Sequence, residues 1–260
     1  MPLLRPRGLV VRGRHNELGG GASRGNTFHI YDEDGNLYYG KQGSADFPYA
    51  VVNEHVAARL ARASGLRVPD HGLSVVDGQH FFLSHGSPFR PALEHLPDFL
   101  ACPVWREEFA ALLAFDTWLI NVDRHFANFL LEKAEPEGDG AGPVYRVHAI
   151  DHDRALFSDG LALAALYQKD RIEPFAIHKA LPMLIKQKVT LKRSHVDEQV
   201  ARIQAVSPTD IAGFLSDIPN ALLPPDEKSA VESIILRRQL DLAKMVDAMC
   251  LHAEYRPSFV

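Results

Sequence analysis

Residues 121–128 read Asn-Val-Asp-Arg-His-Phe-Ala-Asn and directly follow an apolar run, residues 109–120, that is typical of a buried helix. A helix that only had to stop would need one Gly or Asn followed by Pro. Here Asp123 and Asn128 stand five positions apart instead. A carboxylate can accept the proton of a hydroxyl group and an amide oxygen can bind Mg²⁺, so this spacing favours phosphoryl transfer to a hydroxyl.

A second carboxylate completes this pattern. Asp151 follows the β-prone run at residues 144–150, where a strand end could aim its side chain at a bound nucleotide. In this order we expect Asp123 to be the catalytic base and Asn128 and Asp151 to be Mg²⁺ ligands. His125 would either contact the transferred phosphoryl group or brace the loop. Arg124 is expected to be structural, bound to a neighbouring carboxylate or carbonyl.

Residues nearer the N-terminus fit a site for the phosphates of a nucleotide. The glycine-rich run at 19–25 lies between two expected strands, and its backbone N–H groups would cover phosphate oxygens. Lys41 ends the next strand and would neutralise phosphate charge, with Glu54 on the following helix holding its ammonium in place. Taken singly, these features are a flexible turn, a solvated lysine and a surface glutamate. The nucleotide-binding residues predicted from this series are Gly20, Gly21, Ser23, Lys41 and Glu54.

The elements that must position these residues divide the chain into two regions. Residues 8–84 carry strand and turn signals, with hairpins expected at 34–35 and 77–78, and one helix between 49 and 65. Beyond residue 85 the pattern is mainly helical, apart from a hairpin within 128–150. We therefore predict an α+β protein with two lobes: a small β-rich N-lobe with one helix (1–84) and a larger, mainly helical C-lobe (85–260).

Composition limits the classes of function. The chain has 28 Lys and Arg against 33 Asp and Glu, a net charge of −5, which argues against nucleic acid as the main partner. Cys102 and Cys250 are far apart and show no metal-type spacing, so neither a disulfide scaffold nor a structural zinc site is expected. No run approaches the length of a membrane span, and the sequence therefore predicts a cytoplasmic protein.

These motifs resemble those of the HipA-like kinases, bacterial relatives of the protein kinases and phosphoinositide kinases. The resemblance rests on residues 120–131, 148–156 and 53–69, extends over about 8–250, and is most specific within 115–157. The Asp-Arg-His-x-x-Asn form favours this branch over ordinary protein kinases. The resemblance implies a two-lobed protein-kinase-like fold, ATP bound between the lobes, Mg²⁺, and phosphorylation of Ser or Thr in a protein substrate. It also implies that the backbone of residues 84–87 forms the hinge that meets adenine, with Ser84 and His85 among the nucleotide-binding residues. Some members are toxins, so an antitoxin-like partner is also implied.

The chain departs from that family pattern in two places. Asp153 stands where a glycine is usual after the metal-binding Asp-x pair. We expect the Asp153 side chain to point differently from that of Asp151 and, because the family pattern has no carboxylate there, its replacement by Asn to be mild. The chain is also shorter than full-length HipA proteins, which carry an extra N-terminal domain.

Three alternatives stay open at the level of sequence. A small-molecule or lipid-type phosphotransferase would use the same core residues. A catalytically weak kinase-like binding module would keep the fold without turnover, and a nucleotidyl transferase would leave AMP on its target. The identity of the acceptor, the oligomeric state and autophosphorylation at Ser23 are not specified by any pattern in the chain.

Overall fold

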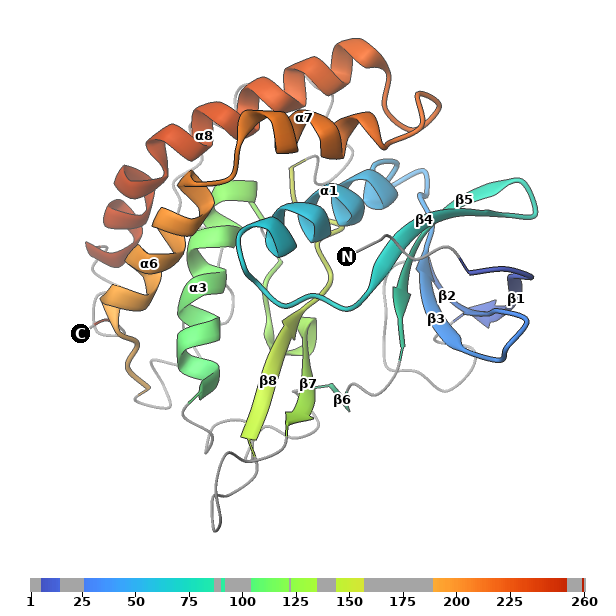
Figure 1. Cartoon of the computed structure of the whole chain (residues 1–260), viewed down its shortest axis with the longest axis horizontal. Helices are drawn as coiled ribbons and strands as arrows, with labels where there is room; N and C mark the ends of the chain where they lie inside the picture. The colour runs from blue at the N-terminus through green and yellow to red at the C-terminus, as the bar shows by residue number, and fades with distance from the viewer. Residues whose placement is uncertain are drawn as a thin grey trace.

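The structure is a computed structural model of the 260-residue chain. It describes residues 6–14, 26–86, 90–91, 104–121, 123–134, 144–156, 189–251 and 259. Figure 1 shows a β-sheet on one side of the molecule and a group of helices on the other, with helix α1 between them. The predicted α+β architecture with a β-rich and a mainly helical part is thus confirmed, whereas the boundary placed at residue 84 stays a prediction.

The β-rich part is a five-stranded antiparallel sheet in the order β1-β2-β3-β5-β4. Both hairpins lie where turn residues predicted them. The β2–β3 turn is held by the Asp32 carboxylate, which accepts the backbone N–H groups of Asp34 and Asn36. At the β4–β5 turn, Asp77 and Gly78 both have positive φ, 50° and 76°, as a two-residue type I′ turn requires. The strands are β1 Val10–Arg14, β2 Thr27–Tyr31, β3 Leu37–Lys41, β4 His71–Val76 and β5 Gln79–His85.

Helix α1 (Ala50–Ala63) is the expected single helix of this region. It ends in a Schellman motif: Leu66 N–H donates to the Ala61 carbonyl and Gly65, with φ 82°, donates to Arg62. Nearly the whole helix is buried because it packs on two sides. Val51 and Ala58 form a small cluster with Phe82 of the sheet, whereas five others join the core of the helical part: Val52, Val56, Ala57, Leu60 and Ala61.

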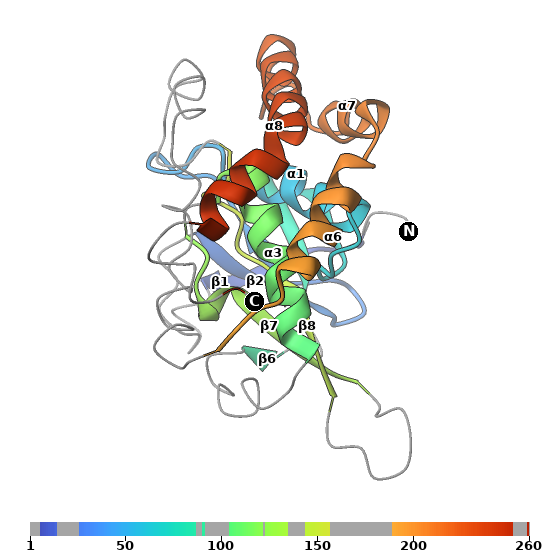
Figure 2. The ribbon, with the colours of Figure 1, turned by 90° about the vertical axis from the view of Figure 1, so that its left-hand side faces the viewer.

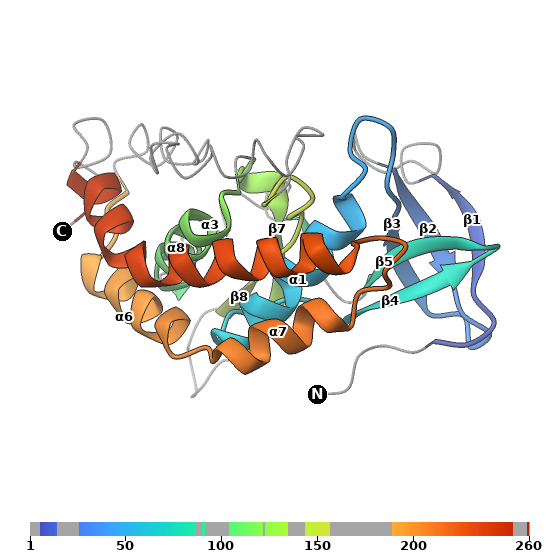
Figure 3. The same ribbon diagram turned by 90° about the horizontal axis from the view of Figure 1, so that it is seen from above.

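The helical part is built around α3 (Val104–Leu119), whose aromatic residues are fully buried. Helices α6 (Arg193–Gln204) and α8 (Pro225–Leu251) pack on it, and α7 (Pro208–Ser216) lies beside α8. Figure 3 shows α8 extending along this part of the molecule, with its N-terminal end nearest the sheet. Sequence patterns pointed to α3, α7 and α8 but did not single out α6. Within the described residues, no helix is both long and apolar enough to cross a membrane.

The predicted hairpin inside the helical part is present. β7 (Phe129–Ala134) pairs with β8 (Val144–Ala149), and the two-residue strand β6 (Arg90–Pro91) adds to the other edge of β7. A short 3₁₀ helix, Phe126–Asn128, leads directly into β7. The hairpin lies on the side of α3 away from α7 and α8 (Figure 2). The hairpin therefore brings residues 128 and 150, the two ends of the segment in which it was predicted, next to each other.

Truncating Leu60 tests whether α1 depends on the helical core. Leu60 is fully buried within that core, whereas Leu240 on α8 is 80% exposed. Leu60→Ala should lower the free energy of unfolding by about 2–5 kcal/mol because it removes buried apolar contacts and leaves a cavity. The matched change Leu240→Ala should stay within about 0.5 kcal/mol. Urea unfolding measures both, and equal midpoints for the two variants would contradict this packing.

Candidate active site

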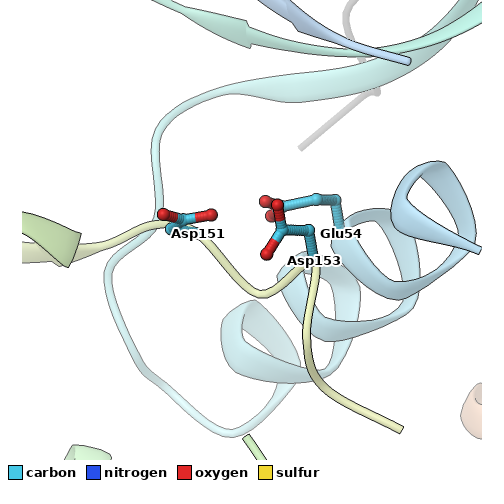
Figure 4. A group of neighbouring side chains, drawn as sticks. All are labelled: Glu54, Asp151 and Asp153. Atoms are coloured by element: carbon cyan, nitrogen blue, oxygen red, sulfur yellow. The ribbon is translucent and has the colours of Figure 1, made fainter. Parts of the chain in front are cut away.

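The site begins with the side-chain ammonium of Lys41 at the end of β3. Its Nζ forms ion pairs with Glu54 Oε1 of α1 and with Asp151 Oδ1 after β8, and lies 3.5 Å from Asp153 Oδ2. The expected contact between Lys41 and Glu54 is therefore present. Figure 4 shows the three carboxyl groups gathered about one space, Glu54 and Asp153 reaching toward each other with Asp151 beside them. One cation thus ties together the sheet, α1 and the segment after β8.

The cluster holds three carboxyl groups and one ammonium, and these charges, together with burial, shift the pKa values of all four groups. Burial disfavours the ammonium of Lys41, but the charges of Asp151, Asp153 and Glu54 outweigh it and raise the pKa well above its usual value. Burial disfavours the charged form of Glu54 too, yet the Lys41 ammonium lowers the pKa of this carboxyl to about 2. The pKa of Asp151 is also lowered, against the effect of burial, mainly by Lys41. For Asp153, burial and the charges of Asp151 and Glu54 prevail over Lys41, and the pKa rises to about 7.

Arg124 holds the other side of the site together. It forms a two-pronged ion pair with Asp116 of α3, from Nε to Oδ2 at 2.8 Å and from Nη2 to Oδ1 at 3.0 Å, and both side chains are fully buried. Its Nη1 donates to the carbonyls of Asn128, at 3.0 Å, and Ile150, at 2.7 Å. Arg124 therefore joins α3, the start of β7 and the segment after β8, as its expected structural role requires.

His152 links Arg124 to the lysine cluster. Its Nε2 lies 2.9 Å from Arg124 Nη2, and because a guanidinium only donates, Nε2 must accept and the ring proton sits on Nδ1. That Nδ1 faces Glu54 Oε2 at 3.8 Å. The edge of the imidazole also meets the ring of Phe115 on α3, with centroids 5.8 Å apart. The buried histidine thus connects the two charged groups of the site.

The loop that carries Asp123 is shaped by the end of α3. Asn121 N–H donates to the Asp116 carbonyl at 3.0 Å, which places Ile120 at a positive φ of 55°, a strained conformation for a β-branched residue. The Asn121 side chain then donates to Asp116 Oδ1 and accepts the Asp123 N–H. These bonds fix the direction in which Asp123 leaves the helix, and its side chain is only partly buried.

Asn128 and Asp151 come together through backbone and side-chain bonds. Asn128 is buried, and its Nδ2 donates to the Asp123 carbonyl at 2.8 Å. The Ile150 N–H donates to the Asn128 carbonyl at 3.3 Å, so Asp151 begins one residue beyond that contact. Asp151 adopts a positive φ of 64°, a conformation that Asp tolerates better than most residues. The structure thus places Asp123, Asn128 and Asp151 in one bonded unit, while their roles in metal binding and catalysis stay predictions.

The remaining predicted nucleotide contacts are less defined. Ser84 and His85 belong to β5, and the N–H of His85 donates to the Asp70 carbonyl at 2.8 Å while that of Gly86 donates to Leu37 at 3.0 Å. These two backbone donors are thus used inside the sheet, and a contact to adenine would need other backbone groups. His125 is partly buried, and its carbonyl accepts the Asn128 N–H. Gly20, Gly21 and Ser23 lie outside the described residues.

Comparison with known proteins adds the fold family. No protein-family model matches the sequence, and no curated protein matches it at a significant level. The proinflammatory kinase CtkA of Helicobacter pylori superposes with a TM-score of 0.62 at 15% identity, covering 96% of this chain and 99% of that one. HipA of Shewanella oneidensis, in complex with HipB and operator DNA, gives 0.57 at 14% identity, covering 95% and 75%. The chain has the fold of the HipA-like kinases.

The position of Asp153 in this HipA-like fold corrects one expectation. The Asp153 side chain was expected to point differently from that of Asp151, and this was wrong, because side chains two positions apart along a strand face the same side and the strand has in any case ended here. β8 ends at Ala149, and the left-handed backbone at Asp151 starts a turn. That turn brings the Asp153 carboxyl back to Lys41, where its oxygen and those of Glu54 and Asp151 lie within 4.8 Å of one another.

Two further residues of the candidate site were not predicted from the sequence patterns. Asp116 was treated as part of an apolar helix and given no role. A carboxylate on an otherwise buried helix needs a partner, so its presence there could have indicated an ion pair. The sequence patterns assigned His152 no role in the site, where it is buried and hydrogen-bonded. Its position between Arg124 and Glu54 depends on the turn after β8, which no local sequence pattern predicts.

Replacing Arg124 should lower the stability of the protein. Arg124→Met leaves the carboxylate of Asp116 buried without its cation, so the free energy of unfolding should fall by about 3–5 kcal/mol. Arg193→Met removes ion pairs to Asp197 and Asp247 at the surface and should cost at most about 1 kcal/mol.

The double variant Arg124→Met with Asp116→Leu distinguishes an unpaired charge from lost packing. It should recover part of the stability in urea unfolding, because no charge is then left buried alone. A double variant as unstable as the sum of the single changes would show that the ion pair is not the source of the effect.

The charge excess around Lys41 predicts a pH dependence of stability. With a folded pKa of about 7 against an unfolded value near 3.8, Asp153 takes up a proton on folding between these pH values. Its protonation therefore stabilises the fold below about pH 4, and this contribution is lost as the pH rises through 7. Asp153→Asn, which stays neutral, should match the parent near pH 4 and be the more stable protein at pH 8.

Chemical unfolding in EDTA at pH 4 and pH 8 measures this difference between the two proteins. Asp46→Asn at an exposed position controls for the loss of one negative charge. A parent protein that is more stable than Asp153→Asn at pH 8 would contradict the charge excess.

Proposed function

We propose that this chain is an ATP- and Mg²⁺-dependent kinase that transfers the γ-phosphoryl group to a Ser or Thr hydroxyl of a protein. The observation that carries the proposal is the ammonium of Lys41, held by Glu54 and Asp151 at the meeting point of the sheet, α1 and the segment after β8. A lysine paired with a helix glutamate, beside a metal-binding Asp, is the arrangement that positions phosphates in protein kinases. The HipA-like fold supports this proposal.

The donor set fits Mg²⁺. Carboxylate oxygens of Glu54, Asp151 and Asp153 lie within 4.8 Å of one another, and hard oxygen ligands of this kind are those that Mg²⁺ prefers. One ammonium faces three carboxylates, so a cation would relieve the excess of negative charge. We assign the metal to Asp151 and Asn128, with Glu54 holding Lys41. When bound, Mg²⁺ would offset the charge of the phosphate oxygens.

Each residue then has a distinct task in transfer. Lys41 would orient the phosphates and neutralise their charge, and Asp123 would accept the proton of the acceptor hydroxyl. The bond from Asn128 Nδ2 to the Asp123 carbonyl ties the base to the metal ligand, so acceptor and phosphoryl group would be positioned by one rigid loop. Gly20, Gly21 and Ser23 would cover the phosphates, Ser84 and His85 would lie beside adenine, and His125 would lie near the transferred group.

The acceptor and partner complete the proposal. The HipA neighbour was determined in a complex with HipB and operator DNA, and an antitoxin-like protein partner is part of what we propose for this chain. Labelling a cell lysate with γ-³²P-ATP, with and without the active protein, would separate protein acceptors from lipids and small molecules. Label appearing only in the lipid or small-molecule fraction would replace the protein-kinase assignment by another phosphotransferase.

Two variants test the separate roles of Asp123 and Asp151. Asp123→Ala should leave Mg·ATP affinity within about twofold and lower turnover by about 10²–10⁴-fold, because it removes a group needed mainly in the transition state. Asp151→Asn keeps the shape but loses the charge of a metal ligand, so it should abolish both Mg²⁺-dependent ATP binding and turnover without unfolding the protein.

Calorimetric titration of Mg·ATP and incorporation of ³²P measure binding and turnover, with Asp46→Asn as a surface control. Equal losses of affinity and rate in Asp123→Ala would show that Asp123 acts in nucleotide binding instead.

A further inference from the structure

Arg154 lies against the proposed catalytic base and is not used by the chemistry described above. Its Nε is 3.5 Å from Asp123 Oδ2, and the side chains of Arg154 and Asp123 are 26% and 21% exposed. The guanidinium also lies over the ring of Phe47, 5.0 Å from its centroid. Arg154 thus sits at the mouth of the site, between the catalytic loop and the loop that joins β3 to α1.

Phe47 is itself held firmly. Its N–H donates to Ser44 Oγ at 3.1 Å, and its carbonyl accepts the N–H of Ala50 at the start of α1 at 3.2 Å. The loop is tight at Gly43, where a Cβ would come within 2.9 Å of the Pro48 carbonyl oxygen, so only glycine fits. The ring therefore offers a fixed platform on which the planar guanidinium of Arg154 rests.

Three cationic side chains among the described residues contact the carboxylates of the site, and two of them form ion pairs only with its inner carboxylates. Arg124 is completely buried against Asp116, and Lys41 lies among Glu54, Asp151 and Asp153. Arg154 is the one among these three that pairs with the base and keeps a solvent-exposed edge. An acceptor hydroxyl bound to Asp123 would therefore lie next to the exposed side of the Arg154 guanidinium.

Binding of an acceptor changes what Arg154 can pair with. A hydroxyl that donates to the Asp123 carboxylate competes with the guanidinium for its oxygens, which weakens the contact between Asp123 and Arg154. Stacked on Phe47, the guanidinium then needs another anion within reach. A carboxylate next to the acceptor residue would supply it, with the two-pronged geometry that Arg favours.

We propose that Arg154 is a specificity-determining residue that selects Ser or Thr acceptors flanked by Asp or Glu. The inference rests on the kinase function proposed above and names its substrate class, an acidic peptide segment. In the absence of acceptor, Arg154 holds the Asp123 carboxylate in place.

The test uses Ser-centred peptide libraries in which the neighbouring positions are Glu, Ala or Lys, phosphorylated with Mg·ATP by the full chain. The parent protein should phosphorylate Glu-flanked peptides about threefold better than Ala-flanked ones, as a partly exposed ion pair predicts. Arg154→Met should lose this preference through a higher KM for the peptide, and Arg154→Glu should reverse it toward Lys-flanked peptides.

Conservative changes separate recognition from structural damage. Arg154→Lys keeps the charge and should retain a weaker preference for Glu, because an ammonium cannot stack on Phe47 as a guanidinium does. Phe47→Leu should weaken the preference in the same way while leaving Arg154 in place. Arg202→Glu on the exposed face of α6 is the control for net charge and should behave as the parent protein.

The outcomes distinguish this inference from the kinase proposal itself. Calorimetry should show Mg·ATP affinity within about twofold of the parent for Arg154→Met, since Arg154 is assigned to the acceptor. A Glu preference that survives unchanged in Arg154→Glu overturns the inference. So does a parent protein that binds and turns over Mg·ATP yet phosphorylates no library peptide, while a parent that neither binds nor consumes Mg·ATP overturns the kinase function.

Discussion

The buried ion pair between Arg124 and Asp116 is the interaction on which the architecture of the site depends. Taking two charges out of water is costly, and the cost is offset only because every donor of this guanidinium has a partner. Those partners belong to α3, to the start of β7 and to the segment after β8. A single side chain therefore dictates the spacing between the loop of Asp123 and the turn of Asp151.

A second constraint lies in the way α1 is shared between the two parts of the molecule. One face of the helix meets Phe82 of the sheet, while Val56 and Leu60 belong to the core around α3. Glu54 is carried by this shared helix, and Lys41 by the sheet itself. Any movement of the sheet relative to the helical part would therefore change the Lys41–Glu54 contact, so this pair would report how the two parts are placed.

The site carries an excess of negative charge. Glu54, Asp151 and Asp153 compete for one ammonium, and the pKa of Asp153 rises because burial and the charges of Asp151 and Glu54 outweigh the effect of Lys41. Such perturbed pKa values gather at functional sites, although structural ion-pair networks also produce them. Arg154 brings a positive charge to the neighbouring Asp123, so the surroundings of Asp123 and of Asp153 differ in sign.

The sequence by itself determined the features that depend on neighbours along the chain. Asp-Gly turns specified the two N-terminal hairpins, Gly65 ended α1, and the spacing of Asp123 and Asn128 drew attention to the loop after α3. Only the tertiary structure decided that Asp116 is the partner of Arg124 and that Asp153 turns back to Lys41. The contact between Lys41 and Asp151 joins residues 110 positions apart, and its geometry follows from a left-handed turn and a shared core. Local periodicity carries no information about such contacts, because they arise from how separate elements pack.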